Sequence, residues 1–77
     1  MITVFVQNND KTQTVRCSDG SQGVMQFDKD SSAPFYKFQF YAHRHPSFWV
    51  SSRQFTDGKK VVVKDVDHEE NFTLKFV

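Results

Sequence analysis

The sequence predicts a small all-β domain, and three observations lead to this fold class. Apolar residues alternate with polar ones along most of the chain, which is the pattern of half-buried strands, and helical periodicity is nearly absent. Turn-forming residues interrupt this alternation at short intervals. Nine Phe, two Tyr and one Trp supply the core, because each large ring buries roughly 150–250 Å². We expect about six short strands in a small antiparallel barrel or a two-layer sandwich.

The first half of the chain predicts a hairpin followed by an ambiguous segment. Residues 2–6 and 12–17 alternate as strands, and Asn9-Asp10 between them suits a two-residue turn. Residues 21–27 follow a glycine-containing turn and fit either a short strand or one short helix. The turn at Asn9-Asp10 sets the register of the opening hairpin, with Ile2 opposite Cys17 and Val4 opposite Val15. This register gives the hairpin one apolar face.

The second half predicts four more strands joined by short connections. The strands are expected over residues 35–44, 48–55, 60–66 and 72–76. The connections are expected at residues 45–47, at Asp57-Gly58, which is the strongest hairpin signal of the chain, and at residues 67–71. The expected pairs include Arg44 with Phe48, His43 with Trp49, Arg53 with Val62, and Phe55 with Lys60.

These registers give the central sheet two unlike faces. One face is apolar and is the expected core, with Phe38, Phe40, Ala42, Val50, Val61 and Val63. The other face mixes cations with large rings, and its members are Lys37, Tyr41, His43, Trp49, Arg53, Phe55, Lys60 and Lys64. Depending on how the sheet closes, the rings of Trp49 and Phe55 either stay on the outside or pack inward.

The mixed face is the candidate binding site, and two partner classes fit its composition. Proteins that bind single-stranded nucleic acid stack bases on aromatic rings, at about 1–3 kcal/mol per base, while cations follow the phosphates. Trp, Tyr and Arg are also favoured at the centres of protein interfaces. The sequence therefore predicts a small non-catalytic binding module, for single-stranded nucleic acid or alternatively for a protein partner, as a small subunit or inhibitor. Formation of a homodimer stays open.

The charge distribution is asymmetric although the net charge is only +1. Residues 35–64 carry six cations against one anion, whereas residues 65–71 carry four anions and no Lys or Arg. A basic middle segment is a typical footprint for an anionic partner, but adjacent opposite charges also suit a self-complementary surface. The near-zero total favours the protein partner, and the pairing of rings with cations favours nucleic acid.

Signals for catalysis or metal binding are weak. No nucleophile motif surrounds the serines, and the glycines at 20 and 23 do not form a phosphate-binding loop. His43, His45 and His68 lack the ligand spacing of a zinc family, so we expect surface histidines and no metal. Cys17 is expected to be an inert apolar side chain within a strand. We therefore expect neither an enzyme nor a cofactor.

Length and cysteine content set the remaining expectations. Seventy-seven residues suit a single domain, residues 1–77. One cysteine cannot form an internal disulfide, whereas small secreted domains usually contain several. Met1 leads directly into an alternating segment without the features of a signal peptide, and no apolar run approaches the length of a membrane span. We expect a cytoplasmic protein without a membrane partner.

Overall fold

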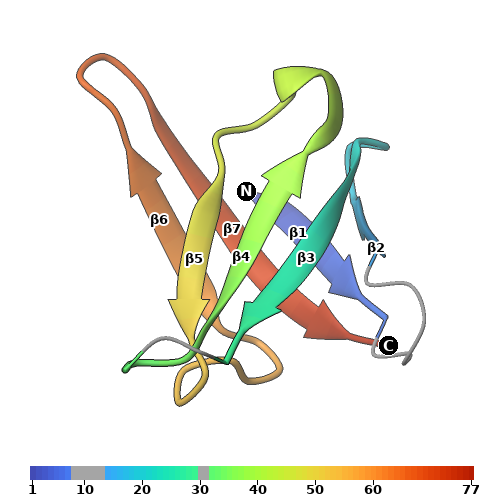
Figure 1. Ribbon diagram of the computed structural model, residues 1–77. Helices are drawn as coiled ribbons and strands as arrows, with labels where there is room; N and C mark the ends of the chain where they lie inside the picture. Colours follow the sequence, from blue (N-terminus) through green and yellow to red (C-terminus); the bar gives the residue numbers. More distant parts are fainter. Residues whose placement is uncertain (8–13, 30–31) are drawn as a thin grey trace.

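A single curled sheet forms the whole fold in the computed structural model, which describes residues 1–7, 14–29 and 32–77 (Figure 1). In this part of the chain the strands are β1 (Ile2–Val6), β2 (Thr14–Cys17), β3 (Gln22–Asp28), β4 (Phe35–Phe40), β5 (Phe48–Ser51), β6 (Lys60–Lys64) and β7 (Glu69–Phe76). A 3₁₀ turn, η1 (Tyr41–His43), follows β4. The strand order is β5-β4-β3-β2-β1-β7-β6. The all-β prediction is confirmed, and the sheet is a nearly closed barrel. Within the same residues, no helix is long and apolar enough to cross a membrane.

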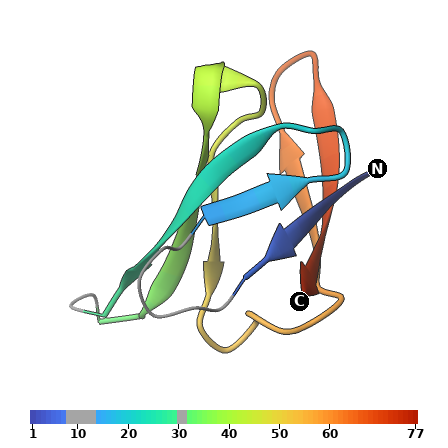
Figure 2. The ribbon, with the colours of Figure 1, turned by 90° about the vertical axis from the view of Figure 1, so that its right-hand side faces the viewer.

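A parallel pair joins the two ends of the chain inside this sheet. β1 lies beside β7 with Val4 opposite Leu74, while the other paired strands are antiparallel. The parallel pair departs from the expected purely antiparallel sheet. Because β7 returns to the first strand, β5 and β6 become the two ends of the strand order and lie next to each other around the barrel (Figures 1 and 2).

Inward-facing side chains fill the barrel, and aromatic rings dominate them. The ring of Phe38 stacks on that of Phe48 at 4.8 Å, and Phe72 contacts both Phe48, at 4.9 Å, and Phe40, at 5.9 Å. Around these rings the buried residues are Val4, Val6, Val15, Cys17, Met25, Val50 and Leu74. Val61 and Val63 are half-buried against this core. The expected apolar face is therefore inside the barrel, with the exception of Ala42.

The ambiguous segment at residues 21–27 is a strand and not a helix, because it forms β3. Gly23 within it is buried against β4, and a Cβ at this position would collide with the carbonyl oxygen of Gln39 and the Cα of Phe40. The glycine that made the segment ambiguous in the sequence therefore permits the close approach of two strand backbones.

The opening hairpin has a different register from the expected one. Val4 pairs with Cys17 and Val6 pairs with Val15, which is a shift of two residues. A shift by an even number leaves the same side chains on the same face, so the apolar face is preserved. The expected turn at Asn9-Asp10 lies outside the described residues.

The strand expected over residues 35–44 ends at Phe40, and this changes the pairing of β4 with β5. Phe38 faces Phe48 and Lys37 faces Trp49, so the expected pairs of Arg44 with Phe48 and His43 with Trp49 do not form. The connection spans residues 41–47 because Ala42 and His43 adopt left-handed conformations, with φ of 56° and 50°. Ala42, expected in the core, is therefore exposed.

The Asp57-Gly58 turn exists, but it does not join β5 to β6 as a hairpin. Gly58, with φ of 84°, donates its N–H to Leu74 O at 2.8 Å, and Asp57 Oδ1 accepts from Phe76 N at 2.8 Å. The turn therefore guides β6 onto β7, so the expected pairs of β5 with β6 do not form. The β6–β7 hairpin turns at residues 65–68, where Asp65 and His68 exchange backbone hydrogen bonds, and not at residues 67–71.

The close approach at Gly23 predicts a large cost for a single methyl group. Gly23→Ala should lower the free energy of unfolding by about 2 kcal/mol, because the backbones of β3 and β4 must separate. Urea denaturation measures this loss. Gln22→Ala, an exposed change on the same strand, should stay within about 0.5 kcal/mol of the wild type. Equal stability of Gly23→Ala and the wild type would contradict the proposed packing.

The left-handed backbone after β4 predicts a stabilising substitution. Ala42→Gly should raise the free energy of unfolding by about 0.5–1 kcal/mol, because glycine avoids the clash of Cβ at positive φ. Ala33→Gly is the matched control, since Ala33 is an exposed alanine without a positive φ. It should lower stability by a similar amount through the greater entropy of the unfolded chain. A loss of stability in both variants would argue against the left-handed turn.

Candidate functional site

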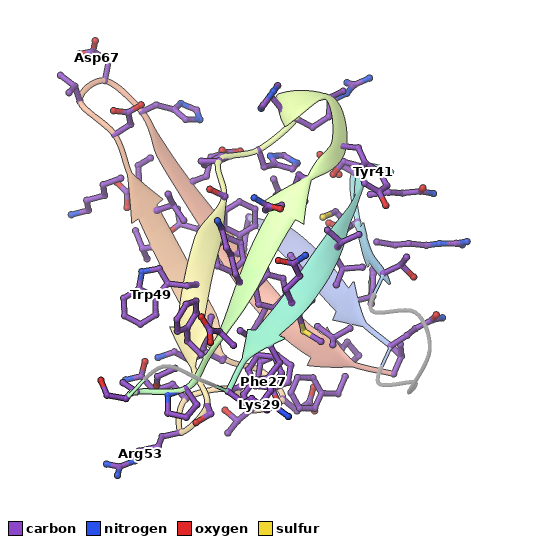
Figure 3. The ribbon with its side chains drawn as sticks, viewed as in Figure 1. Phe27, Lys29, Tyr41, Trp49, Arg53 and Asp67 are labelled. Carbon is purple, nitrogen blue, oxygen red and sulfur yellow. The ribbon has the colours of Figure 1, made fainter. Side chains whose placement is uncertain are left out.

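Trp49 is the most prominent exposed ring on the barrel wall. It lies on the outward side of β5, is 66% exposed, and contacts Phe35 edge-on at 5.8 Å between ring centroids. Lys37 is its direct neighbour across the β4–β5 pair. Figure 3 shows the indole pointing away from the barrel on the side of β6. Phe35 packs against part of the ring, while most of the Trp49 side chain stays exposed.

The outward side of β6 continues the basic character of this region. Lys60, Val62 and Lys64 alternate with inward residues and are all exposed, with Val62 at 52%. Lys60 and Lys64 are four residues apart, which is about 13 Å along an extended strand. β5 and β6 are neighbours around the barrel and border the same gap between strands (Figures 1 and 2).

One further cation extends the region beyond the end of β5. Arg53 is exposed in the turn that follows this strand and lies below Trp49 in Figure 3. At the other end Glu69 lies opposite Lys64 in the β6–β7 register, and the exposed Asp65 follows Lys64 in the chain. We call this region the Trp49 surface and define it by Phe35, Lys37, Trp49, Arg53, Lys60, Val62 and Lys64.

The structure separates two predicted site residues from this surface. Tyr41 and His43 belong to η1, beyond the far end of β4, because the strand ends at Phe40. Tyr41 is 52% exposed and lies at the opposite side of the molecule from Trp49 in Figure 3. The expectation that they share a face with Trp49 is wrong, since it assumed a strand that continues to residue 44.

Phe55 also leaves the predicted face, because it packs inward. Its ring stacks on Tyr36 at 3.9 Å with an interplanar angle of 19°, and it contacts Phe76 at 4.8 Å. The chain turns beneath the barrel after β5, where Ser52 N–H donates to Pro34 O at 3.0 Å. Phe55 therefore closes one end of the core and does not share a face with Trp49.

The opposite end of the core is closed by His45, which sequence reasoning placed on the surface. Only 7% of its side chain is exposed, and the imidazole packs edge-on against Phe40 and Phe72. Nδ1 lies 2.7 Å from Glu70 Oε1, and Nε2 lies 2.8 Å from Asp19 Oδ2 and 3.1 Å from Ser21 Oγ. Position 45 precedes a proline in a polar connection, so no local pattern indicated this burial. The expectation holds for His43 and His68, which are exposed.

Two groups beside His45 have shifted pKa values. The pKa of Asp19 is lowered to about 2, first because the Ser21 hydroxyl and N–H donate to Oδ1, at 2.6 and 3.0 Å, and then because of His45. Burial raises the pKa of the Cys17 thiol, which agrees with the expected inward-facing cysteine. The tight turn from Cys17 to Ser21 brings these side chains together, with Cys17 N–H donating to Ser21 O at 2.8 Å.

Comparison of the chain with protein-family models, with curated proteins and with solved structures found no match.

The lowered pKa of Asp19 predicts an acid-dependent contribution to stability. A carboxylate with a depressed pKa stabilises the folded state fully above its unfolded value, near 4, and loses that contribution as the pH falls through about 2. Asp19→Asn should therefore be less stable than the wild type at pH 5–7, and the difference should shrink between pH 4 and 2. Urea denaturation across this range, in buffer free of divalent metals, measures it.

The control for this measurement is Asp67→Asn, which changes an exposed carboxylate at the tip of the β6–β7 turn (Figure 3). Its stability should follow that of the wild type at each pH. A difference between Asp19→Asn and the wild type that stays constant from pH 6 to pH 2 would contradict the assigned contribution of the Asp19 carboxylate.

Proposed function

We propose that the protein binds single-stranded nucleic acid on the Trp49 surface. The exposed ring of Trp49 supports this most directly, because an indole that is 66% exposed and held at one edge by Phe35 offers a flat face to a base. A ring already held in place loses little freedom when a base stacks on it. Stacking on such a ring contributes about 1–3 kcal/mol per base.

The cations around Trp49 support the same partner. Lys37, Arg53, Lys60 and Lys64 lie on the strands and turn that border the ring. Their separation along the wall suits several phosphates of one extended strand, since Lys60 and Lys64 alone span about 13 Å. Stacking and phosphate contacts do not distinguish one base from another. We therefore expect the protein to bind with weak sequence preference.

A second candidate function is the binding of an extended peptide segment of a protein partner. Among the described strands, β5 and β6 each pair on one side only, so their open edges face the same gap. Exposed apolar side chains, Trp49 and Val62, flank these edges. An added strand would use backbone hydrogen bonds for affinity and these side chains for selectivity.

The nucleic-acid proposal predicts a loss of affinity on removal of one ring. Trp49→Ala should weaken binding of a fluorescein-labelled single-stranded oligonucleotide by about tenfold or more, measured by fluorescence anisotropy at low salt. Tyr41→Ala is the matched control, because Tyr41 is another exposed ring on a different part of the molecule. It should bind as the wild type does. Equal losses in both variants would exclude a site centred on Trp49.

Salt dependence separates the two candidate functions. Binding to phosphates should weaken steeply with salt, and each of Lys37→Ala and Lys60→Ala should reduce the slope of log K against log salt by about 0.7. Arg16→Ala is the control, because Arg16 is exposed on β2, the central strand of the order and the farthest from the gap. Absence of oligonucleotide binding at low salt would reject nucleic acid as the partner and leave the peptide segment as the candidate.

A further inference from the structure

The cluster around His45 contains three different metal-ligating groups at one end of the barrel. Cys17 Sγ, a carboxylate oxygen of Asp19 and a ring nitrogen of His45 all lie within 4.8 Å of one another. They come from the end of β2, from the turn after it and from the connection between β4 and β5. The long-range packing of the barrel, and not local sequence spacing, brings these ligands together.

We propose that Cys17, Asp19 and His45 form a Zn²⁺ site that fastens the β2–β3 turn to the connection between β4 and β5. A thiolate, an imidazole and a carboxylate are the side chains that zinc takes in proteins. The mixed set of sulfur, nitrogen and oxygen donors also disfavours Mg²⁺ and Ca²⁺, which prefer oxygen ligands alone.

The imidazole is already oriented as a zinc ligand requires. Metal-binding histidines commonly donate the N–H of the other ring nitrogen to a carboxylate, which fixes the ring and its tautomer. Glu70 Oε1 is in that position, 2.7 Å from Nδ1, and the Glu70 side chain is only 15% exposed. Nε2 is thereby directed toward Asp19 and the β2–β3 turn.

The movements needed to bind an ion are small. Ligand atoms of a tetrahedral zinc lie about 3.4–3.6 Å apart, given bond lengths of about 2.0–2.3 Å. His45 Nε2 and Asp19 Oδ2 are 2.8 Å apart, so an ion between them would separate the two atoms slightly, and any proton shared between them would pass to solvent as the Zn–N and Zn–O bonds form. Cys17 Sγ lies within 4.8 Å of these two atoms and would move closer to them to reach bonding distance of the ion. The Cys17 thiol releases its proton to solvent as the Zn–S bond forms.

The cluster borders solvent on the side of Asp19. A hollow of about 350 Å³ is lined in part by Asp19, Ser21 and Arg44. Asp19 has 42% of its side chain exposed, whereas His45 is almost fully covered. Three protein ligands and this open side leave the fourth coordination position to water.

Titration with Co²⁺, which binds zinc sites and reports thiolate ligation by near-ultraviolet absorption, tests the proposal. In the reduced protein the absorption should rise to saturation at one equivalent and disappear when Zn²⁺ is added. Cys17→Ser should abolish the band, and Asp19→Asn should weaken Co²⁺ binding at least about tenfold. Zn²⁺ should also raise the Tm of the wild type more than that of Asp19→Asn, because an ion that binds only the folded state stabilises it.

His43→Asn is the matched control, since His43 is an exposed histidine two residues from His45, and asparagine tolerates its positive φ. It should bind Co²⁺ as the wild type does. If Cys17→Ser does not fold, the exposed substitution Asp19→Asn decides the result. The proposal is overturned if the wild type shows no thiolate band. It is overturned equally if His43→Asn weakens binding as much as Asp19→Asn, because the ion would then occupy surface histidines.

Discussion

The contact between Phe48 and Phe72 is the interaction on which the shape of the barrel depends. Among the described strands no backbone ladder joins β5 to β6, because the two strands are opposite ends of the strand order. Phe48 of β5 instead meets Phe72 of β7 across the interior at 4.9 Å, with Phe40 beside them. Packing of inward rings therefore closes the sheet where hydrogen bonds do not. One consequence is that two open strand edges remain on the outside, next to Trp49 and Val62.

The two ends of the barrel are closed by different chemistry, and this difference locates the reactive groups. Phe55 covers one end by stacking on Tyr36 and contacting Phe76, so this end is closed by aromatic rings. His45 covers the other end, where its ring contacts Phe72 while both nitrogens reach carboxylates. A buried imidazole needs hydrogen-bond partners, and Asp19 and Glu70 provide them. The same requirement assembles a set of metal-ligating groups.

The sequence predicted the features that depend on local residue patterns and missed those that depend on contacts between distant parts of the chain. Alternation predicted the strands and most of the core, because it reflects the burial of each strand on one side. Strand pairing was predicted poorly, since Asp57-Gly58 signals a turn but does not say that β7 is the strand onto which it leads. Trp49 and Lys37 lie on the same face, as expected, because the observed β4–β5 register differs from the expected one by an even number of residues. His45 was missed because its burial depends on residues far away in the chain.

We favour a nucleic acid strand over an added β-strand as the partner proposed for the gap between β5 and β6, because the side chains there can offer phosphate contacts as well as stacking. β5 contains four residues and β6 five, so either edge can offer only a few backbone hydrogen bonds to a partner. Each such bond contributes about 0.5–1.5 kcal/mol net, because it replaces a bond to water. One base stacked on Trp49 contributes about 1–3 kcal/mol, and phosphate contacts with Lys37 and Lys60 add to this at low salt. Under this proposal, stacking on Trp49 is of the same order as what so short a strand edge can offer, and the phosphate contacts add binding energy that a peptide strand would not gain.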